Sequence, residues 1–202
     1  MSEQATGLRE RKKQATREAL ARAGLELFVE RGYDETTLAE IADVAGVSTR
    51  TIFAYFPSKE DILFSTLQTM RDALARALAE RPAGVDALSA LREFILSSVH
   101  EKTELDHKLG CAIAADPTLA SHRRARLGQL QEVIAAAIAD DLGVPADDRR
   151  PQIAAASLNA AFELLEQDDE RGPWRTATTE EVAAAIDPVL SFVRAGLAAL
   201  PE

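Results

Sequence analysis

The sequence lacks several features that whole classes of protein need. It contains a single cysteine, which excludes an internal disulfide and any zinc or redox site built on paired cysteines. Its longest apolar run, residues 133–139, is far shorter than the ~20 residues that cross a bilayer. Its first residues lack the basic and apolar regions of a signal peptide. We therefore expect a cytoplasmic protein without a membrane partner.

Motifs of the common enzyme classes are also missing. The sequence has no Gly-x-Ser-x-Gly, P-loop, Gly-x-Gly-x-x-Gly or His-Glu-x-x-His motif. Aromatic residues make up only 5% of the 202 residues, but the shares of hydrophobic and charged residues, 47% and 28%, are typical of a globular chain. This length allows one or two domains with a buried core. We expect a soluble protein that is not an enzyme and needs no cofactor.

Charge is distributed unevenly along the chain. The formal net charge of −10, from 23 basic and 33 acidic residues, argues by itself against a nucleic-acid partner. Residues 8–22, however, contain six basic and two acidic residues, whereas residues 61–202 contain 14 basic and 23 acidic ones. A basic N-terminal segment on an acidic body is compatible with DNA binding and also with a simple solvated helix face.

Apolar residues recur with the period of an α-helix over most of the chain. Leu20, Gly24, Leu27 and Phe28 share one face of a first helix, which Gly32 is expected to end. The same period continues in five further segments, residues 62–78, 88–99, 127–142, 150–167 and 179–200. Alternating strand patterns and internal repeats are absent. These observations predict an all-α protein of about nine helices.

The segment from Thr36 to Leu63 carries the densest local signals. It contains three helix N-cap patterns in succession, Thr37 with Glu40, Ser48 with Thr51, and Ser58 with Asp61. Three helix starts in so short a segment require short helices and tight turns. The spacing predicts a helix-turn-helix, with a helix over residues 37–45, a turn at Gly46 and a recognition helix over residues 48–55.

The recognition helix presents side chains that suit a DNA groove. Ile52 is expected to point inward, which turns Thr49, Arg50, Thr51 and Tyr55 outward. Arg50 offers a two-pronged donor to a guanine edge or to a phosphate. The uncharged phosphate donors are the hydroxyls of Thr37, Ser48, Thr51 and Tyr55.

These residues resemble a known family. The pattern Gly32-Tyr33, Thr37, Ile41-Ala42, Ala45-Gly46-Val47-Ser48, Thr51-Ile52-Phe53 and Tyr55-Phe56-Pro57-Ser58-Lys59-Glu60 is similar to the N-terminal domain of TetR-family transcriptional regulators. The resemblance covers roughly residues 11–63. It implies phosphate contacts for Thr37, Ser48 and Lys59, and base contacts for Thr49, Arg50 and Thr51. Phe53 replaces a common tyrosine and is expected only to pack, whereas Tyr55 replaces a frequent histidine and is kept as a contact.

The resemblance also implies an organisation and a function. Residues 1–57 would form the N-terminal arm and DNA-binding domain, and residues 58–202 an effector-binding and dimerisation domain. We expect a homodimeric repressor that binds palindromic double-stranded operator DNA and leaves it when a small molecule binds. The alternative is a helical adaptor that binds an acidic protein through its basic N-terminus, which explains the charge distribution but not the three helix starts.

The remaining helices provide candidates for the effector pocket and the dimer interface. The last two helices, residues 150–167 and 179–200, are expected to form a two-fold interface, the first with its small residues and the second with the stripe Val182, Ile186, Val189, Leu190, Val193 and Leu197. The candidate pocket residues are mostly apolar and suggest a hydrophobic or aromatic effector. They are Leu67, Met70, Leu91, Phe94, Ile95, His107, Cys111, Leu130, Ile134, Phe162 and Leu165.

A few other residues have both a functional and a structural interpretation. His100, Glu104 and His107 fit one helix face and would suit a metal ion, but no second such motif exists, so we expect a polar surface and no metal site. Cys111 is expected to be a buried small residue rather than a redox sensor. Trp174 either closes the pocket or anchors a loop.

Overall fold

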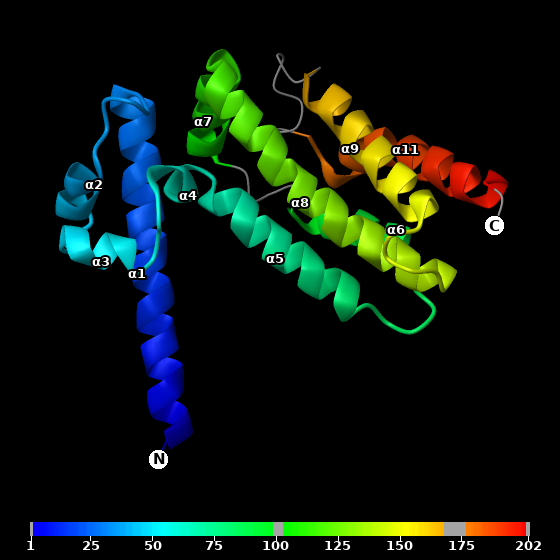
Figure 1. Cartoon of the computed structure of the whole chain (residues 1–202), viewed down its shortest axis with the longest axis horizontal. Coiled ribbons are helices and arrows are strands. Elements are labelled where there is room, and N and C mark those ends of the chain that lie inside the picture. Colours follow the sequence, from blue (N-terminus) through cyan, green and yellow to red (C-terminus); the bar gives the residue numbers. More distant parts are fainter. Residues whose placement is uncertain (1, 99–102, 168–176, 201–202) are drawn as a thin grey trace. The chain divides into compact units, whose positions relative to one another are not determined.

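The structure is a computed structural model that describes residues 2–98, 103–167 and 177–200. This part of the chain contains ten helices and no strand, which confirms the predicted all-α class (Figure 1). The helices are α1 (Ser2–Arg31), α2 (Leu38–Val44), α3 (Thr49–Phe53), α4 (Lys59–Leu63), α5 (Ser65–Ala79), α6 (Ala87–Ser98), α7 (Glu104–Ala115), α8 (Pro117–Leu142), α9 (Arg149–Gln167) and α11 (Thr179–Ala199).

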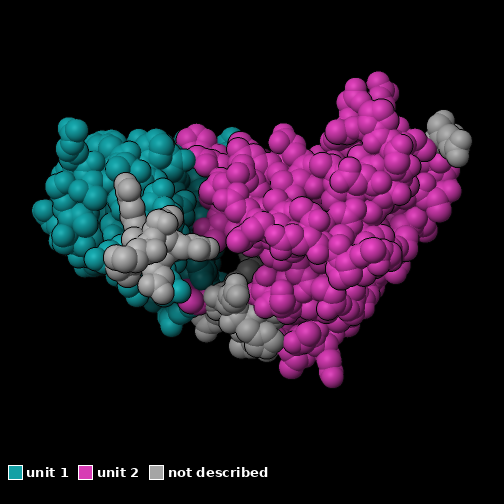
Figure 2. Space-filling view, turned by 90° about the horizontal axis from the view of Figure 1, so that it is seen from below, with its two compact units in different colours: residues 1–66, 104–121 teal, residues 67–103, 122–202 magenta. Residues whose placement is uncertain are grey.

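The chain forms two compact units (Figure 2). Unit 1 comprises Met1–Thr66 and Glu104–Ser121, and unit 2 comprises Leu67–Thr103 and His122–Glu202. Unit 1 therefore includes α7 as well as the helices at the start of the chain. The predicted division into residues 1–57 and 58–202 stays a prediction.

The core of unit 1 forms around the C-terminal half of α1. Leu20 and Phe28 of α1 are buried together with Ile41 of α2, Ile52 of α3 and Ile62 of α4. As predicted, α1 ends before Gly32, whose positive φ of 96° lets its N–H donate to the carbonyl oxygen of Phe28 at 3.0 Å. This packing holds the short helices α2, α3 and α4 on the one long helix.

The segment after the third N-cap contains two helices where the apolar period suggested one. Phe64 closes α4 with φ −99° and ψ 18°, outside the helical range, and α5 begins at Ser65. Because Phe64 is itself buried, the break costs no apolar contact. The periodicity continued across the break because a single non-helical residue hardly shifts the apolar pattern.

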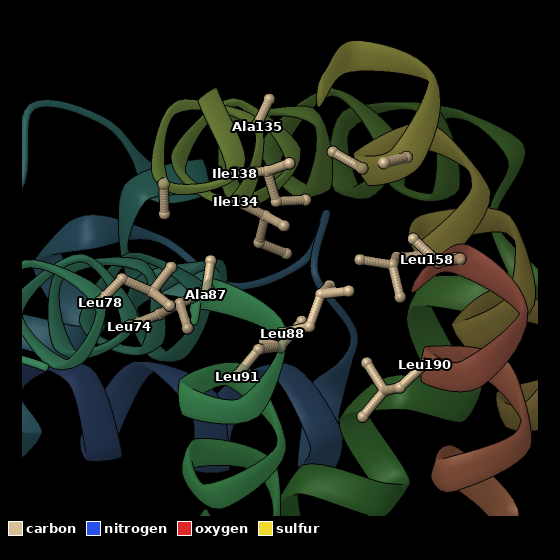
Figure 3. Packing of buried hydrophobic residues seen from close by; sticks show 14 of the residues in the cluster. Leu74, Leu78, Ala87, Leu88, Leu91, Ile134, Ala135, Ile138, Leu158 and Leu190 are labelled. Carbon is tan, nitrogen blue, oxygen red and sulfur yellow. The ribbon is translucent and has the colours of Figure 1, made fainter. Parts of the chain in front are cut away.

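Unit 2 is a bundle of α5, α6, α8, α9 and α11 around one hydrophobic cluster (Figure 3). Leu74, Leu88, Ile138, Leu158 and Leu190 represent these five helices in its core. Helix α11 packs against both α9 and α6. The α6–α11 contact is bordered by two ion pairs, Arg92 with Asp187 and Asp86 with Arg194.

The apolar stripe of α11 packs into the core of unit 2, whereas the prediction was that it packs against a second subunit. Val182, Ile186 and Val193 are buried inside their own subunit, so they cannot supply the expected two-fold interface. Helix α11 is also the one helix of the described residues that is long and apolar enough to cross a membrane, with a mean hydropathy of 1.5. Its large exposed apolar side chain is Phe192, 73% exposed.

Candidate nucleic-acid interface

Side-chain hydrogen bonds start each of the three short helices, as predicted. The hydroxyl of Thr37 accepts from the Glu40 N–H at 3.3 Å, and a Glu40 carboxylate oxygen accepts from the Thr37 N–H at 2.9 Å. The Thr37 hydroxyl also donates to this carboxylate at 2.8 Å. The bonds that the carboxylate accepts from the hydroxyl and the N–H of Thr37, with the guanidinium of Arg31 nearby, lower the pKa of Glu40. The N–H groups of Thr51 and Asp61 donate to the hydroxyls three residues earlier, each at 3.2 Å.

The turn between α2 and α3 is built on Gly46. Its φ of +67° lies in the left-handed region, where a side chain would be strained. The turn closes because the Val47 N–H donates to the Ala42 carbonyl oxygen at 2.9 Å. Ile41 and Ile52, both fully buried, then pack α2 and α3 together. The predicted helix-turn-helix is confirmed, with α3 as its second helix.

Helix α3 carries Thr49, Arg50 and Thr51, three of the seven predicted contact residues, with Ser48 as its N-cap and Tyr55 two residues after its end. Thr49 and Arg50 are exposed, whereas Thr51 and Tyr55 are half-buried. The hydroxyls of Ser48 and Thr51 share a hydrogen bond of 2.7 Å, so one of the two O–H donors is already used within the protein. Phe53 is 56% exposed, so the expectation that it only packs is wrong. It lies one residue after the buried Ile52, on the side of the helix that turns away from the core.

A basic groove lies beside α3. It has a volume of about 620 Å³ between the N-terminal part of α1 and the end of α3. Its lining combines three basic residues with polar and small ones, Glu10, Arg11, Lys13, Gln14, Arg17, Ala54 and Tyr55. The Arg17 guanidinium also stacks on the buried Phe56 ring, 4.9 Å from its centre. The sequence showed the basic run, but only the fold brings it next to Tyr55.

Lys59 has a different environment from the other predicted contacts. Its ammonium donates to the carbonyl oxygens of Tyr33 at 2.6 Å and Thr36 at 3.0 Å, with that of Asp34 at 3.4 Å. It also lies 4.2 Å from the centre of the Tyr33 ring. The ammonium is therefore largely satisfied by hydrogen bonds within the protein. The phosphate contact expected for Lys59 stays a prediction.

The predicted effector residues fall in both units. Leu91, Leu130 and Ile134 belong to the unit 2 core. Packed against that core, and partly buried, are Met70, Phe94, Ile95, Phe162 and Leu165. Leu67 is half-buried in unit 2. The effector pocket stays a prediction.

Two of these residues lie instead on α7, in unit 1. Cys111 and His107 are both exposed, with the Cys111 sulfur 3.8 Å from Nε2 of His107. The expectation that Cys111 is buried is wrong, because the neighbouring Leu109 and Ile113 occupy the inner face of α7. His100 and Trp174 lie outside the described residues.

Comparison with known proteins agrees with this arrangement. Residues 20–66 match the family described as bacterial regulatory proteins of the tetR family, and residues 85–198 match the MftR C-terminal domain. The chain is 33% identical over 172 residues to the HTH-type transcriptional regulator TcmR of Streptomyces glaucescens. That match covers 80% of this chain and 76% of TcmR.

Solved structures share the fold. NalD, the secondary repressor of the MexAB-OprM multidrug efflux pump in Pseudomonas aeruginosa, has a TM-score of 0.59 at 22% identity and covers 88% of this chain and 96% of its own. The complex of SmeT with triclosan has a TM-score of 0.60 at 23% identity, with 88% and 91% covered. SmeT is a repressor from Stenotrophomonas maltophilia. The relatives are regulators rather than enzymes, and the two family matches, the identity to TcmR and the helix-turn-helix show that this chain belongs to the TetR family of bacterial transcriptional regulators.

Proposed function

We propose that the chain is a cytoplasmic, homodimeric repressor that binds a palindromic operator and is released from it by a small-molecule effector. The observation that carries the proposal is the face of α3, where Thr49, Arg50 and Phe53 are exposed beside a groove rich in basic residues. A helix of this kind reads base edges when its outer side chains enter the major groove. An acidic-protein adaptor would not need that face.

The contact residues divide into two roles. Arg50 and Thr49 are assigned to base edges together with Thr51, and the exposed ring of Phe53 suits the methyl group of a thymine. Thr37, Ser48 and Tyr55 are assigned to phosphates. Lys59 is not counted among them, because its ammonium donates to three backbone carbonyl oxygens. Arg11 and Lys13 extend the phosphate contacts along α1, because they line the groove next to Tyr55.

The dimer interface is assigned to the exposed apolar faces of α9 and α11. On α9, Ile153 and Leu164 are 51% and 66% exposed and are connected by the exposed small residues Ala156 and Ala160 at helical spacing. On α11, which packs beside α9, Phe192 is the corresponding large side chain. Such exposed apolar side chains on adjacent helices favour burial against a second copy.

The effector is assigned to the apolar interior of unit 2. The support is the group of partly buried Met70, Phe94, Ile95, Phe162 and Leu165 around the core, which would suit a hydrophobic or aromatic molecule. The solved complex of SmeT with triclosan shows such a molecule on a protein of the same fold. The effector releases the operator only if it binds the DNA-free state more tightly than the bound state.

Selection from a random duplex pool tests the DNA-binding part of the proposal. The full chain should enrich a palindrome whose half-sites lie about 34 Å apart or a multiple of that spacing. Arg50→Ala should lose the enrichment, while Arg149→Ala, a change of an exposed arginine on α9, should retain it. If the wild-type chain enriches no sequence from the pool, the result would favour the alternative function, an adaptor that binds an acidic protein.

A further inference from the structure

A second hollow lies in unit 1, apart from the basic groove. It has a volume of about 360 Å³, within the range of small-molecule sites. Its walls come from the end of α1 and the turn that follows it, from α4, and from α7 with the start of α8. The lining residues all belong to unit 1 and are Phe28, Gly32, Tyr33, Asp34, Glu35, Leu63, Leu109, Ala112, Ile113, Asp116 and Leu119. We call this hollow the α1–α7 cleft.

The lining of the α1–α7 cleft is apolar with an acidic component. Phe28, Leu63 and Ile113 are buried and give it hydrocarbon and aromatic surface. The charged residues among its lining are all acidic, since Asp34, Glu35 and Asp116 contribute and no basic residue does. A molecule that is apolar over most of its surface and positively charged at one end would match both components.

The carboxylates of the cleft are not neutralised by the described part of the chain. Asp34 and Glu35 form no ion pair with any residue that the structure describes, and both are exposed. Asp116 uses one oxygen to accept from the Thr118 N–H at 2.7 Å. Lys59 is the basic residue that contacts the lining, and its ammonium binds backbone carbonyl oxygens rather than these carboxylates.

Negative charges also act on Tyr33, one of the lining residues. The pKa of Tyr33 is raised above its ordinary value, first by burial and then by the negative charges of Glu60 and Asp34. The carboxylates of Asp34, Glu35 and Asp116 in the lining would attract a cation and repel an anion of equal size.

We propose that the α1–α7 cleft binds a small organic cation with an apolar or aromatic body, and that this binding changes the affinity for DNA. The cleft is distinct from the unit 2 interior assigned to the effector. Coupling is expected because α1 forms one wall of the cleft and also carries the helix-turn-helix. The binding half of the proposal is independent of the proposed function, whereas the coupling half rests on it.

Isothermal titration calorimetry of the full chain tests the binding half. The probe is trimethyl(4-phenylbutyl)ammonium, compared with the neutral 4-phenylbutanol and the anionic 5-phenylpentanoate. We expect saturable binding of the cation, weaker binding of the alcohol and none of the anion. Equal affinity for the cation and the alcohol, or no binding of the cation, would overturn the proposal.

Two pairs of variants locate the site. Asp34→Asn with Glu35→Gln should weaken cation binding roughly fivefold, because each exposed carboxylate contributes modestly. Glu26→Gln with Glu30→Gln removes two exposed charges of α1 outside the lining and should change nothing.

The second pair uses steric filling on α7. Ala112→Phe should block the cleft from its rim. Ala114 is also exposed on α7 but does not line the cleft, so the Ala114→Phe variant should bind the cation normally. Loss of binding in both control variants would place the cation elsewhere and contradict the proposal.

Operator titrations with and without the cation test the coupling half. Saturating cation should change the operator Kd by about fivefold or more, and Ala112→Phe should abolish that change. An unchanged Kd in the presence of bound cation would refute the coupling and leave the binding site intact. A chain that binds the cation but no DNA would instead refute the proposed function.

Discussion

The ammonium of Lys59 lies 2.6 Å from the carbonyl oxygen of Tyr33 and 4.2 Å from the centre of its ring. The contact joins the first residue of α4 to the turn that follows α1, 26 residues earlier in the chain. An ammonium with several carbonyl acceptors is well satisfied and resists removal to a phosphate. Lys59 therefore connects the start of α4 to the turn between α1 and α2.

Replacing Lys59 tests whether this connection or a phosphate contact dominates. Lys59→Met should lower the thermal stability and weaken binding to all duplexes alike, while the slope of log affinity against log salt stays unchanged. The physical reason is that three carbonyl oxygens lose their donor, but no phosphate partner is removed. Thermal melts and binding isotherms at several salt concentrations measure both effects. A slope that falls by about one unit per half-site, with unchanged stability, would establish the phosphate contact instead.

Arg50 is expected to contribute to sequence-specific DNA binding, whereas Arg11 is expected to contribute to binding of any DNA sequence. Arg50→Ala should cost about 1–3 kcal/mol per half-site on the selected operator and little on random DNA, because a base edge is read. Arg11→Ala should weaken both duplexes alike and reduce the salt slope. Fluorescence anisotropy with the two duplexes separates the cases. Equal losses on both duplexes for Arg50→Ala would reassign that residue to the DNA backbone.

The dimer interface is testable by charge insertion on its proposed face. Ala160→Glu with Phe192→Glu should give a helical monomer that no longer binds the palindrome tightly, because two unpaired carboxylates would be buried. Light scattering, circular dichroism and operator binding measure the three properties. Ala136→Glu, an exposed change on α8, serves as the control and should remain dimeric. A double variant that stays dimeric would place the interface on another face.

Gly24 is expected to be required for the packing of α1 on α4. A Cβ atom at this position would overlap Cγ2 of Ile62, whose side chain is fully buried. Gly24→Ala should therefore destabilise the protein by about 1–3 kcal/mol. Gly128→Ala, in α8, meets no atom within 4 Å and should stabilise by about 0.5–1 kcal/mol. Urea denaturation compares the two, and a neutral Gly24→Ala would show that the helices can separate without cost.

The ion pair between Asp86 and Arg194 should make stability depend on acidity. Hydrogen bonds from the Arg194 guanidinium to the Asp86 carboxylate lower the pKa of Asp86 from 3.8 to about 2. Because the folded pKa lies below the unfolded one, the contribution is present above about pH 4 and is lost as pH falls toward 2. The pair is largely exposed, so we expect only about 0.2–1 kcal/mol.

The measurement is the difference in unfolding free energy between the unchanged chain and Arg194→Met. That difference should be largest at neutral pH and vanish near pH 2. Arg76→Met, on the exposed side of α5, should give a small difference that does not change with pH. A pH-independent difference for Arg194→Met would mean that the arginine acts through packing rather than charge.

Local interactions explain why the DNA-binding half could be predicted from sequence. The caps at Thr37 and Ser48 join residues only three apart, and Gly46 supplies a backbone conformation that other residues rarely adopt. Such signals involve residues within about one helical turn of each other, so they can be recognised in the sequence without knowledge of the rest of the fold. Helix periodicity likewise revealed most helices and the inward position of Ile52.

Sequence by itself thus determined where helices begin, where the chain turns and which face of each helix is apolar. Tertiary structure decided what covers those faces. Periodicity places Val182 on an apolar helix face, but it does not show that this face packs against helices of the same subunit. It also does not show whether the side chain of Cys111 points into the core or into solvent. The partners of Lys59 and the lining of the α1–α7 cleft come from segments far apart in the chain, so they exist only once the helices pack.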